Sequence, residues 1–260
     1  MNNSLVIIPT YNEKENIEAI IAKVFSLEKA FDVLIVDDGS PDGTGAIVKN
    51  QQSKYNTEID RLHLMERPGK LGLGTAYIDG FRYAIDRHYD YIFEMDADFS
   101  HNPEDLIFLY EACHDQGQDM SIGSRYIKGV NVVNWPMSRV LMSYFASIYV
   151  RLITGMNIRD TTAGFVCYKR AVLETIDLEA VKFIGYAFQI EMKFTAYKFG
   201  FKIGEVPIIF TDRTKGTSKM SQGIFKEAVI GVIQMKVNSW FKKYFKEEVS
   251  PTVDKTTVQA

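Results

Sequence analysis

Two aspartates, Asp96 and Asp98, follow directly after an apolar run that begins at residue 91. In an extended backbone, side chains two residues apart point the same way, so these carboxylates converge. Converging carboxylates suit a hard divalent cation such as Mg²⁺ or Mn²⁺, and such a cation suits a diphosphate. An isolated Asp-x-Asp pair is also typical of a strand-end turn with solvated acids. The rest of the chain must decide between these two interpretations.

The size and composition of the chain narrow the classes of protein to which it can belong. Its 260 residues, 46% of them hydrophobic, suffice for one large α/β domain with a sizeable core. The net charge of −3 gives no sign of nucleic-acid binding. Cys113 and Cys167 lack metal-ligand spacing and suggest no disulfide framework, so we expect the protein to reside in the reducing cytoplasm. Neither a signal peptide nor a transmembrane stretch is apparent.

The first hundred residues alternate between apolar runs and segments with helical spacing. We expect strands at 5–9, 31–36, 61–66 and 91–95, and helices at 13–27, 44–55 and 74–87. Continuous apolar strands separated by helices predict an α/β fold, with a mostly parallel central sheet and helices on both faces. Polar or acidic loops follow the first, second and fourth strands. Because parallel strands bind ligands at their carboxyl ends, these loops are expected to share one site.

Residues 120–159 contain no aspartate or glutamate but carry Arg125 and several further cations. Within them, 138–154 is mostly apolar, with a polar stripe that repeats every four residues, as on one helix face. The stripe consists of Arg139, Ser143, Ser147 and Arg151. Such a helix is too short to span a bilayer comfortably. It fits either the membrane interface or a buried core or dimer contact, and the sequence leaves both open.

The C-terminal part combines a cationic loop at 211–219 with a helical pattern that runs from 223 to about 245. The end of this pattern interleaves lysines with aromatic residues. That combination is typical of a membrane-surface anchor, although ordinary amphipathic helices carry it too. We expect the residues from 247 to 260 to form a disordered tail.

Eight motifs occur along the chain in a specific order. They are PTYNE at 9–13, VDDGSPDGT at 36–44, GLGTAY at 72–77, DADFSH at 96–101, GSRY at 123–126, DTTAGF at 160–165, GYAFQIEM at 185–192, and Arg213 with Lys219. In this order they resemble the GT-A glycosyltransferases of family 2. Within that family they resemble the polyprenyl-phosphate (dolichol-phosphate) mannose synthases of the type without a transmembrane domain. The resemblance covers about residues 4–245.

The resemblance implies a GT-A nucleotide-sugar-binding fold and a role for each matching position. Contacts to the nucleotide base and ribose fall to Pro9, Tyr11, Glu13, Val36 and Asp38. The sugar-diphosphate would be surrounded by Asp96, Ala97 and Asp98, with Asp96 and Asp98 as ligands of Mg²⁺ or Mn²⁺. Donor and acceptor phosphates would be held by Arg125, Arg213 and Lys219. Some family members have a glutamine where this chain has Ser100, so water is expected to replace that ligand.

The implied reaction moves mannose from GDP-mannose to a polyprenyl (dolichyl or undecaprenyl) monophosphate, with inversion at the anomeric carbon and release of GDP. A phosphate monoester is largely dianionic at neutral pH, so the acceptor needs no general base. Glu191 is the only late acid that we consider, and a structural role is favoured for it. The acceptor does need cations, for which Arg125, Arg139, Arg213 and Lys219 are candidates.

The implied organisation is a GT-A catalytic domain at 1–222, with an interfacial helical segment at 130–158, followed by an amphipathic interfacial helix at 223–246. The membrane surface is the expected partner, on its cytoplasmic face, and a membrane-embedded partner protein is a further candidate. Three alternatives stay open. They are a polyprenyl-phosphate glucosyltransferase that uses UDP-glucose or another nucleotide sugar, a family-2 enzyme with a soluble or polysaccharide acceptor, and a non-catalytic nucleotide-sugar-binding scaffold.

Overall fold

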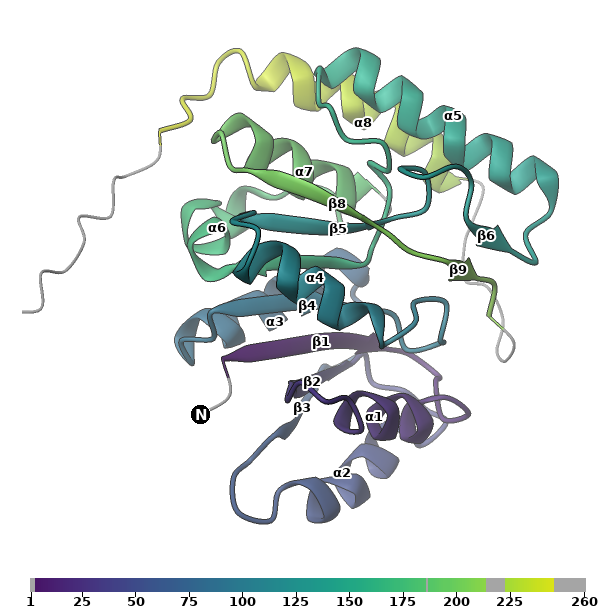
Figure 1. The fold of residues 1–260 in the computed structure, drawn as a ribbon, viewed down its shortest axis with the longest axis vertical. Helices are drawn as coiled ribbons and strands as arrows, with labels where there is room; N and C mark the ends of the chain where they lie inside the picture. Colours follow the sequence, from purple (N-terminus) through teal and green to yellow (C-terminus); the bar gives the residue numbers. More distant parts are fainter. Residues whose placement is uncertain (1–2, 186, 214–222, 246–260) are drawn as a thin grey trace, which may run out of the picture.

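The computed structural model describes residues 3–185, 187–213 and 223–245, with side chains described from 229 onward in the last range. A seven-stranded sheet forms its centre, in the order β3-β2-β1-β4-β7-β5-β8 (Figure 1). These strands are β1 (Ser4–Thr10), β2 (Asp32–Asp37), β3 (Leu62–Glu66), β4 (Tyr91–Glu94), β5 (Met120–Ser124), β7 (Val166–Lys169) and β8 (Ile203–Pro207). The predicted α/β fold with a mostly parallel sheet is therefore confirmed.

Helices cover both faces of the sheet, because β1 and β2 are apolar on both sides and must be buried on both. One face packs against α1 (Ile17–Phe25), α2 (Thr44–Tyr55) and α4 (Asp105–His114). The other face packs against α3 (Leu73–Asp86), α6 (Arg170–Thr175) and α7 (Ala187–Lys198). A short 3-10 turn, Leu178–Ala180, precedes α7. The predicted strands and helices of the first hundred residues are all present, with the ends of the first helix trimmed.

Strand β7 is antiparallel to both of its neighbours, β4 and β5, whereas the other pairings of this sheet are parallel. An antiparallel strand presents its N-terminal end where parallel strands present their carboxyl ends. The loop that precedes β7, residues 160–165, therefore lies at the same edge as the loops that follow β1, β2, β4 and β5. The alternation of the first half of the chain gave no indication of this insertion.

A second layer lies outside α7, where α5 (Met137–Thr154) and α8 (Gly223–Asn238) run side by side (Figure 1). The polar stripe of α5 faces inward: Ser143 and Ser147 are buried, while Phe145 and Leu152 are exposed to 60% and 78%. Helix α8 likewise buries Val232 and exposes other apolar side chains. Neither of these helices, nor any other in the described ranges, is long and apolar enough to cross a membrane.

The three segments predicted at 130–158, 223–246 and 247–260 compare with the structure as follows. Helix α8 begins at Gly223 as predicted but ends at Asn238, so the aromatic and lysine-rich residues from 239 to 245 are not helical. The segment 130–158 is not helical throughout, because Val132–Val133 forms β6, which pairs with β9 (Phe210–Thr211). The tail predicted for 247–260 lies outside the described residues.

Candidate functional site

The loops after β1 and β2 are joined by the side chain of Asp37. Its Oδ1 accepts hydrogen bonds from Thr10 Oγ1 (2.7 Å) and Ser40 Oγ (2.6 Å), and its Oδ2 accepts one from the Ser40 amide. Ser40 Oγ in turn accepts from the Asn12 amide at 2.9 Å. Asp37 is thus a scaffold that holds two predicted nucleotide loops together, a role that the sequence did not separate from that of Asp38.

Asp38 is buried and forms an ion pair with Arg67, which follows β3. Arg67 Nε lies 2.7 Å from Asp38 Oδ1, although the contact lacks the angle of a hydrogen bond. The remaining Arg67 nitrogens reach Asp79, Thr75 and the Gly72 carbonyl. Desolvation raises the pKa of Asp38, and the Arg67 charge opposes that shift. Sequence reasoning missed Arg67, for which the only signal was its position at the end of the third strand.

The other predicted nucleotide-contact residues lie along the same edge. Pro9 and Tyr11 are partly exposed, and Lys70 Nζ sits 5.2 Å from the centroid of the Tyr11 ring. Glu13 is nearly buried and accepts a hydrogen bond from Asn16 Nδ2. Val36 is fully buried in the core, so only its backbone can contact a ligand. Nucleotide contact by these residues stays a prediction.

Asp96 and Asp98 lie just beyond β4, on the turn that follows it. Asp98 is buried, with Oδ1 accepting from the Ser100 amide and Oδ2 lying 2.9 Å from Arg213 Nη2. The Asp96 side chain keeps 40% of its exposure, and Ala97 between them is buried. The fold therefore brings together three of the residues predicted for the sugar-diphosphate site, two carboxylates and the Arg213 guanidinium.

The environment of Asp96 disfavours its ionised form. Desolvation and the negative charge of Asp98 raise the pKa of Asp96 to about 7, while Arg213 opposes the shift. His101 supports the turn, since its Nδ1 accepts a hydrogen bond from the Asp96 amide at 3.2 Å. Burial lowers the pKa of His101 to about 4, so the ring is neutral at physiological pH. It stacks on Phe165 with ring centroids 4.7 Å apart.

The cluster of Asp96 and Asp98 fits a divalent cation. Two carboxylates whose mutual repulsion raises a pKa gain from a cation between them, and both supply the hard oxygen ligands that Mg²⁺ and Mn²⁺ prefer. The Ser100 hydroxyl is buried beside them and has no hydrogen-bond partner within the described ranges. Those ranges hold no group of three or more histidine, cysteine or acidic side chains placed to bind a metal. Substrate phosphates and water would have to complete the coordination.

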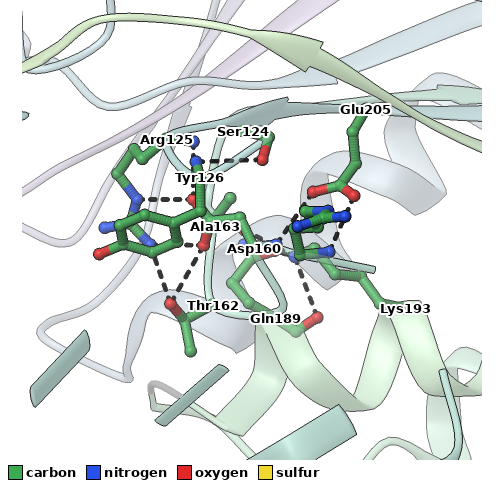
Figure 2. Close-up of polar contacts among 10 residues, drawn as sticks. Ser124, Arg125, Tyr126, Asp160, Thr162, Ala163, Gln189, Lys193 and Glu205 are labelled. Carbon is green, nitrogen blue, oxygen red and sulfur yellow. Dashed lines mark hydrogen bonds and ion pairs between the residues drawn. The ribbon is translucent and has the colours of Figure 1, made fainter. Parts of the chain in front are cut away.

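Arg125 follows β5 and is buried in a two-pronged ion pair with Asp160 (Figure 2). Its Nε donates to Asp160 Oδ2 at 2.7 Å, and its Nη2 donates to Asp160 Oδ1 at 2.6 Å and to Thr162 Oγ1 at 2.9 Å. Burial alone would raise the pKa of Asp160, but Arg125 lowers it below its ordinary value. Arg125 therefore stabilises the loop at 160–165 that precedes β7, and its contact with a phosphate stays a prediction.

Arg139 on α5 pairs with Asp212 at 3.0 Å and lies 4.0 Å from the centroid of the Trp135 ring. Asp212 is the residue before Arg213, so α5 is tied to the loop that supplies the Asp98 partner. Lys219, predicted to hold a phosphate, lies outside the described residues. Glu191 accepts hydrogen bonds from the Lys182 and Phe183 amides, which is the structural role favoured from the sequence.

Comparison with known proteins identifies the family. Residues 5–177 match the model of Glycosyl transferase family 2. The chain is 47% identical over 231 residues, 89% of this chain and 86% of the relative, to a polyprenol monophosphomannose synthase from Mycolicibacterium smegmatis. It is 45% identical over 228 residues, 88% of this chain and 91% of the relative, to an undecaprenyl-phosphate mannosyltransferase from Micrococcus luteus.

Solved structures share the fold at low sequence identity. Glucosyl-3-phosphoglycerate synthase from Mycobacterium tuberculosis, in complex with Mn²⁺, UDP and its product, superposes with a TM-score of 0.63 at 15% identity, covering 92% of this chain and 80% of that one. A Pyrobaculum calidifontis mannosyltransferase, in complex with GDP-Man and Mn²⁺, gives 0.57 at 15%, covering 91% and 73%. By the extent of the family match and the identity to these relatives, the chain belongs to glycosyl transferase family 2.

Proposed function

We propose that this protein transfers mannose from GDP-mannose to a polyprenyl monophosphate and releases GDP. The observation that carries the proposal is the 47% identity, over most of both chains, to a relative named polyprenol monophosphomannose synthase. The site agrees with it, since Asp96, Asp98 and Arg213 form a cluster suited to a cation and a diphosphate. The GDP-Man complex of the mannosyltransferase from Pyrobaculum calidifontis has the same fold, which is compatible with this donor but does not select it.

The donor side of the reaction needs negative charge to be neutralised as the leaving group departs. Asp96 and Asp98 would hold Mg²⁺ or Mn²⁺, which when bound stabilises the diphosphate of departing GDP. Arg213 lies against Asp98, and its guanidinium would contact the same diphosphate. The nucleoside would bind to Pro9, Tyr11, Glu13 and the loop that Asp37 holds in place.

The acceptor side needs a nucleophile but no protein base. An oxygen of the lipid phosphate forms the new bond to the anomeric carbon, while the bond from that carbon to GDP breaks and GDP takes the electron pair. Attack from the opposite side inverts the anomeric centre. Glu191 is engaged with backbone amides, so it is not poised as a base. The acceptor phosphate would be held by cations from the predicted set of Arg125, Arg139, Arg213 and Lys219. Of these, Arg139 on α5 is paired with Asp212, the neighbour of Arg213.

The acceptor is a lipid, so the protein must reach a bilayer. Helices α5 and α8 place exposed apolar side chains on their outward faces, among them Phe145, Leu152, Ile230 and Ile233. Such a face suits the boundary between lipid headgroups and acyl chains. We therefore infer peripheral attachment to the inner face of the membrane through the outward face of α5 and α8, with a membrane-embedded partner as an alternative anchor.

The direct test incubates the purified protein with Mg²⁺ or Mn²⁺, vesicles that contain polyprenyl phosphate, and a panel of labelled nucleotide sugars. We expect label to enter the lipid from GDP-mannose and not from UDP-glucose, and Asp98→Ala to abolish transfer. Label from UDP-glucose would instead establish the glucosyltransferase alternative. Transfer to a soluble acceptor, or binding of nucleotide sugar without turnover, would support the other two alternatives.

A further inference from the structure

A fully buried lysine lies beneath the site, and the proposed reaction gives it no role. Lys193 on α7 has no exposed surface. Its ammonium donates to three oxygens, the Ala163 carbonyl at 2.6 Å, the Gln189 carbonyl at 3.2 Å and the Gln189 side-chain Oε1 at 3.2 Å (Figure 2). An ammonium has three protons to donate, so these bonds use its full capacity.

Gln189 connects this lysine to a buried carboxylate. Its Nε2 donates to Glu94 Oε2 at 2.5 Å, while Tyr168 donates its hydroxyl proton to Glu94 Oε1 at 3.2 Å. Glu94 has no exposed surface and lies two residues before Asp96 on the chain. The lysine can only donate, which fixes the orientation of the amide between the two charges. The series of hydrogen bonds that runs from Tyr168 through Glu94, Gln189 and Lys193 to the Ala163 carbonyl thereby joins β7, β4, α7 and the loop before β7.

The loop at 160–164 is held from three directions. Glu205 on β8 accepts a hydrogen bond from the Asp160 amide at 2.9 Å. Arg125 donates to the side chains of Asp160 and Thr162, and Lys193 donates to the Ala163 carbonyl (Figure 2). A methyl group placed on Gly164 would lie 3.8 Å from the Gln189 amide nitrogen and 4.0 Å from the His101 ring. That ring supports the Asp96 amide, so the loop borders the aspartate turn.

This arrangement is a poor device for stability alone. Buried charges lose hydration, and replacing such a group with well-packed apolar residues is often neutral or stabilising. A bridge through a neutral amide recovers less attraction than direct contact would. What the network does provide is a fixed geometry between β4 and the loop at 160–164.

We propose that Lys193 and Gln189 are positioning residues for sugar transfer. They fix the loop that carries Asp160 against the end of β4. This keeps Arg125, which is bonded to Asp160 and Thr162, in a constant position relative to the Asp96–Asp98 pair. The inference rests on the proposed mannosyl transfer, because it assigns these residues an effect on that reaction.

The test compares Lys193→Met with the double variant Glu94→Gln/Lys193→Met, which removes both buried charges. Lys198→Met is the matched control, a lysine of the same helix that contacts the ring of Tyr244. Four quantities are measured: the melting temperature, the dissociation constant of GDP in the presence of Mn²⁺, and kcat and KM for polyprenyl phosphate. We expect Lys193→Met to lower kcat/KM about tenfold or more, with the GDP dissociation constant changed less than about threefold.

The double variant separates positioning from charge compensation. We expect it to recover the melting temperature while kcat/KM stays low. Recovery of both quantities, or wild-type kinetics in Lys193→Met, would overturn the inference. If Lys193→Met does not fold, Gln189→Met and the double variant take its place with the same expected split. A wild-type protein that transfers no mannose refutes the proposed function and this inference together, whereas an active wild type with unaffected variants refutes the inference alone.

Discussion

Arg213 Nη2 lies 2.9 Å from Oδ2 of Asp98, and the Arg213 side chain remains 27% exposed. A guanidinium in this position can hold the carboxylate in place and also meet a diphosphate that approaches from solvent. We expect Arg213→Ala to lower kcat by about 10²-fold, as loss of one donor to a developing anion does in other enzymes. Steady-state kinetics with labelled GDP-mannose measure the change.

Two variants frame that result. Arg213→Lys keeps the positive charge but loses the planar guanidinium, which can donate two parallel hydrogen bonds. Its kcat should therefore lie between those of wild type and Arg213→Ala. Arg82→Ala removes an exposed arginine of α3 that pairs with Asp79 on the same helix and with Glu179 on the 3-10 turn, and it should leave kcat unchanged. Equal kcat in wild type and Arg213→Ala would remove Arg213 from the site.

The raised pKa of Asp96 makes metal binding depend on pH. A ligand carboxyl must be ionised, and with a pKa of about 7 its ionised fraction falls about tenfold between pH 8 and pH 6. The affinity for Mn²⁺ should therefore weaken as pH falls through this range, by less than about tenfold because the Asp96 side chain is 40% exposed and solvent screens its charge. Titration calorimetry with Mn²⁺ at pH 6, 7 and 8 measures it, with Asp96→Asn as the variant that should lose the binding. An affinity that is constant from pH 6 to pH 8 would contradict the prediction.

The apolar outward face of α5 predicts membrane binding that depends on single side chains. Burial of one large apolar side chain contributes about 2 kcal/mol, so Phe145→Glu and Leu152→Glu should each weaken vesicle binding by tenfold or more. Co-sedimentation with lipid vesicles measures the bound fraction. Phe108→Glu is the matched control, because Phe108 is 52% exposed on α4, a helix of the other face of the sheet. Equal losses in all three variants would rule out this face as the contact.

The buried pair of Asp38 and Arg67 predicts a large effect on stability. Arg67→Met leaves the Asp38 carboxylate desolvated without its cation, which should lower the free energy of unfolding by about 3 kcal/mol. Urea denaturation measures this loss. The double variant Asp38→Asn/Arg67→Met should recover much of it, because no uncompensated charge remains. A loss below about 1 kcal/mol in the single variant would show that the pair does not stabilise the fold.

Local pattern predicted the first half of the fold well because its strands are continuous apolar runs and its helices are periodic. Helix α2 has the predicted bounds, Thr44–Tyr55, and β4 begins at Tyr91 as expected. Helix α7 was not located. It buries Phe188, Ile190, Met192 and Phe194 and also Lys193, so most of its faces are covered and no amphipathic stripe marks it.

The sequence by itself determined the family resemblance and the order of the strand-end motifs, because these depend only on which residues follow one another. The extended backbone from which the convergence of Asp96 and Asp98 was predicted ends at Glu94, and Asp98 lies on the turn that follows. Only the tertiary structure decided the partners: Arg125 meets Asp160, Arg67 meets Asp38, and α5 turns its serines inward. Each of these pairings joins segments that are distant in sequence. The contact of Arg125 with Asp160 follows from the antiparallel insertion of β7, and the orientation of α5 follows from its packing on α8. The pair of Arg67 and Asp38 follows from the parallel pairing of β2 with β3, which brings their carboxyl ends together.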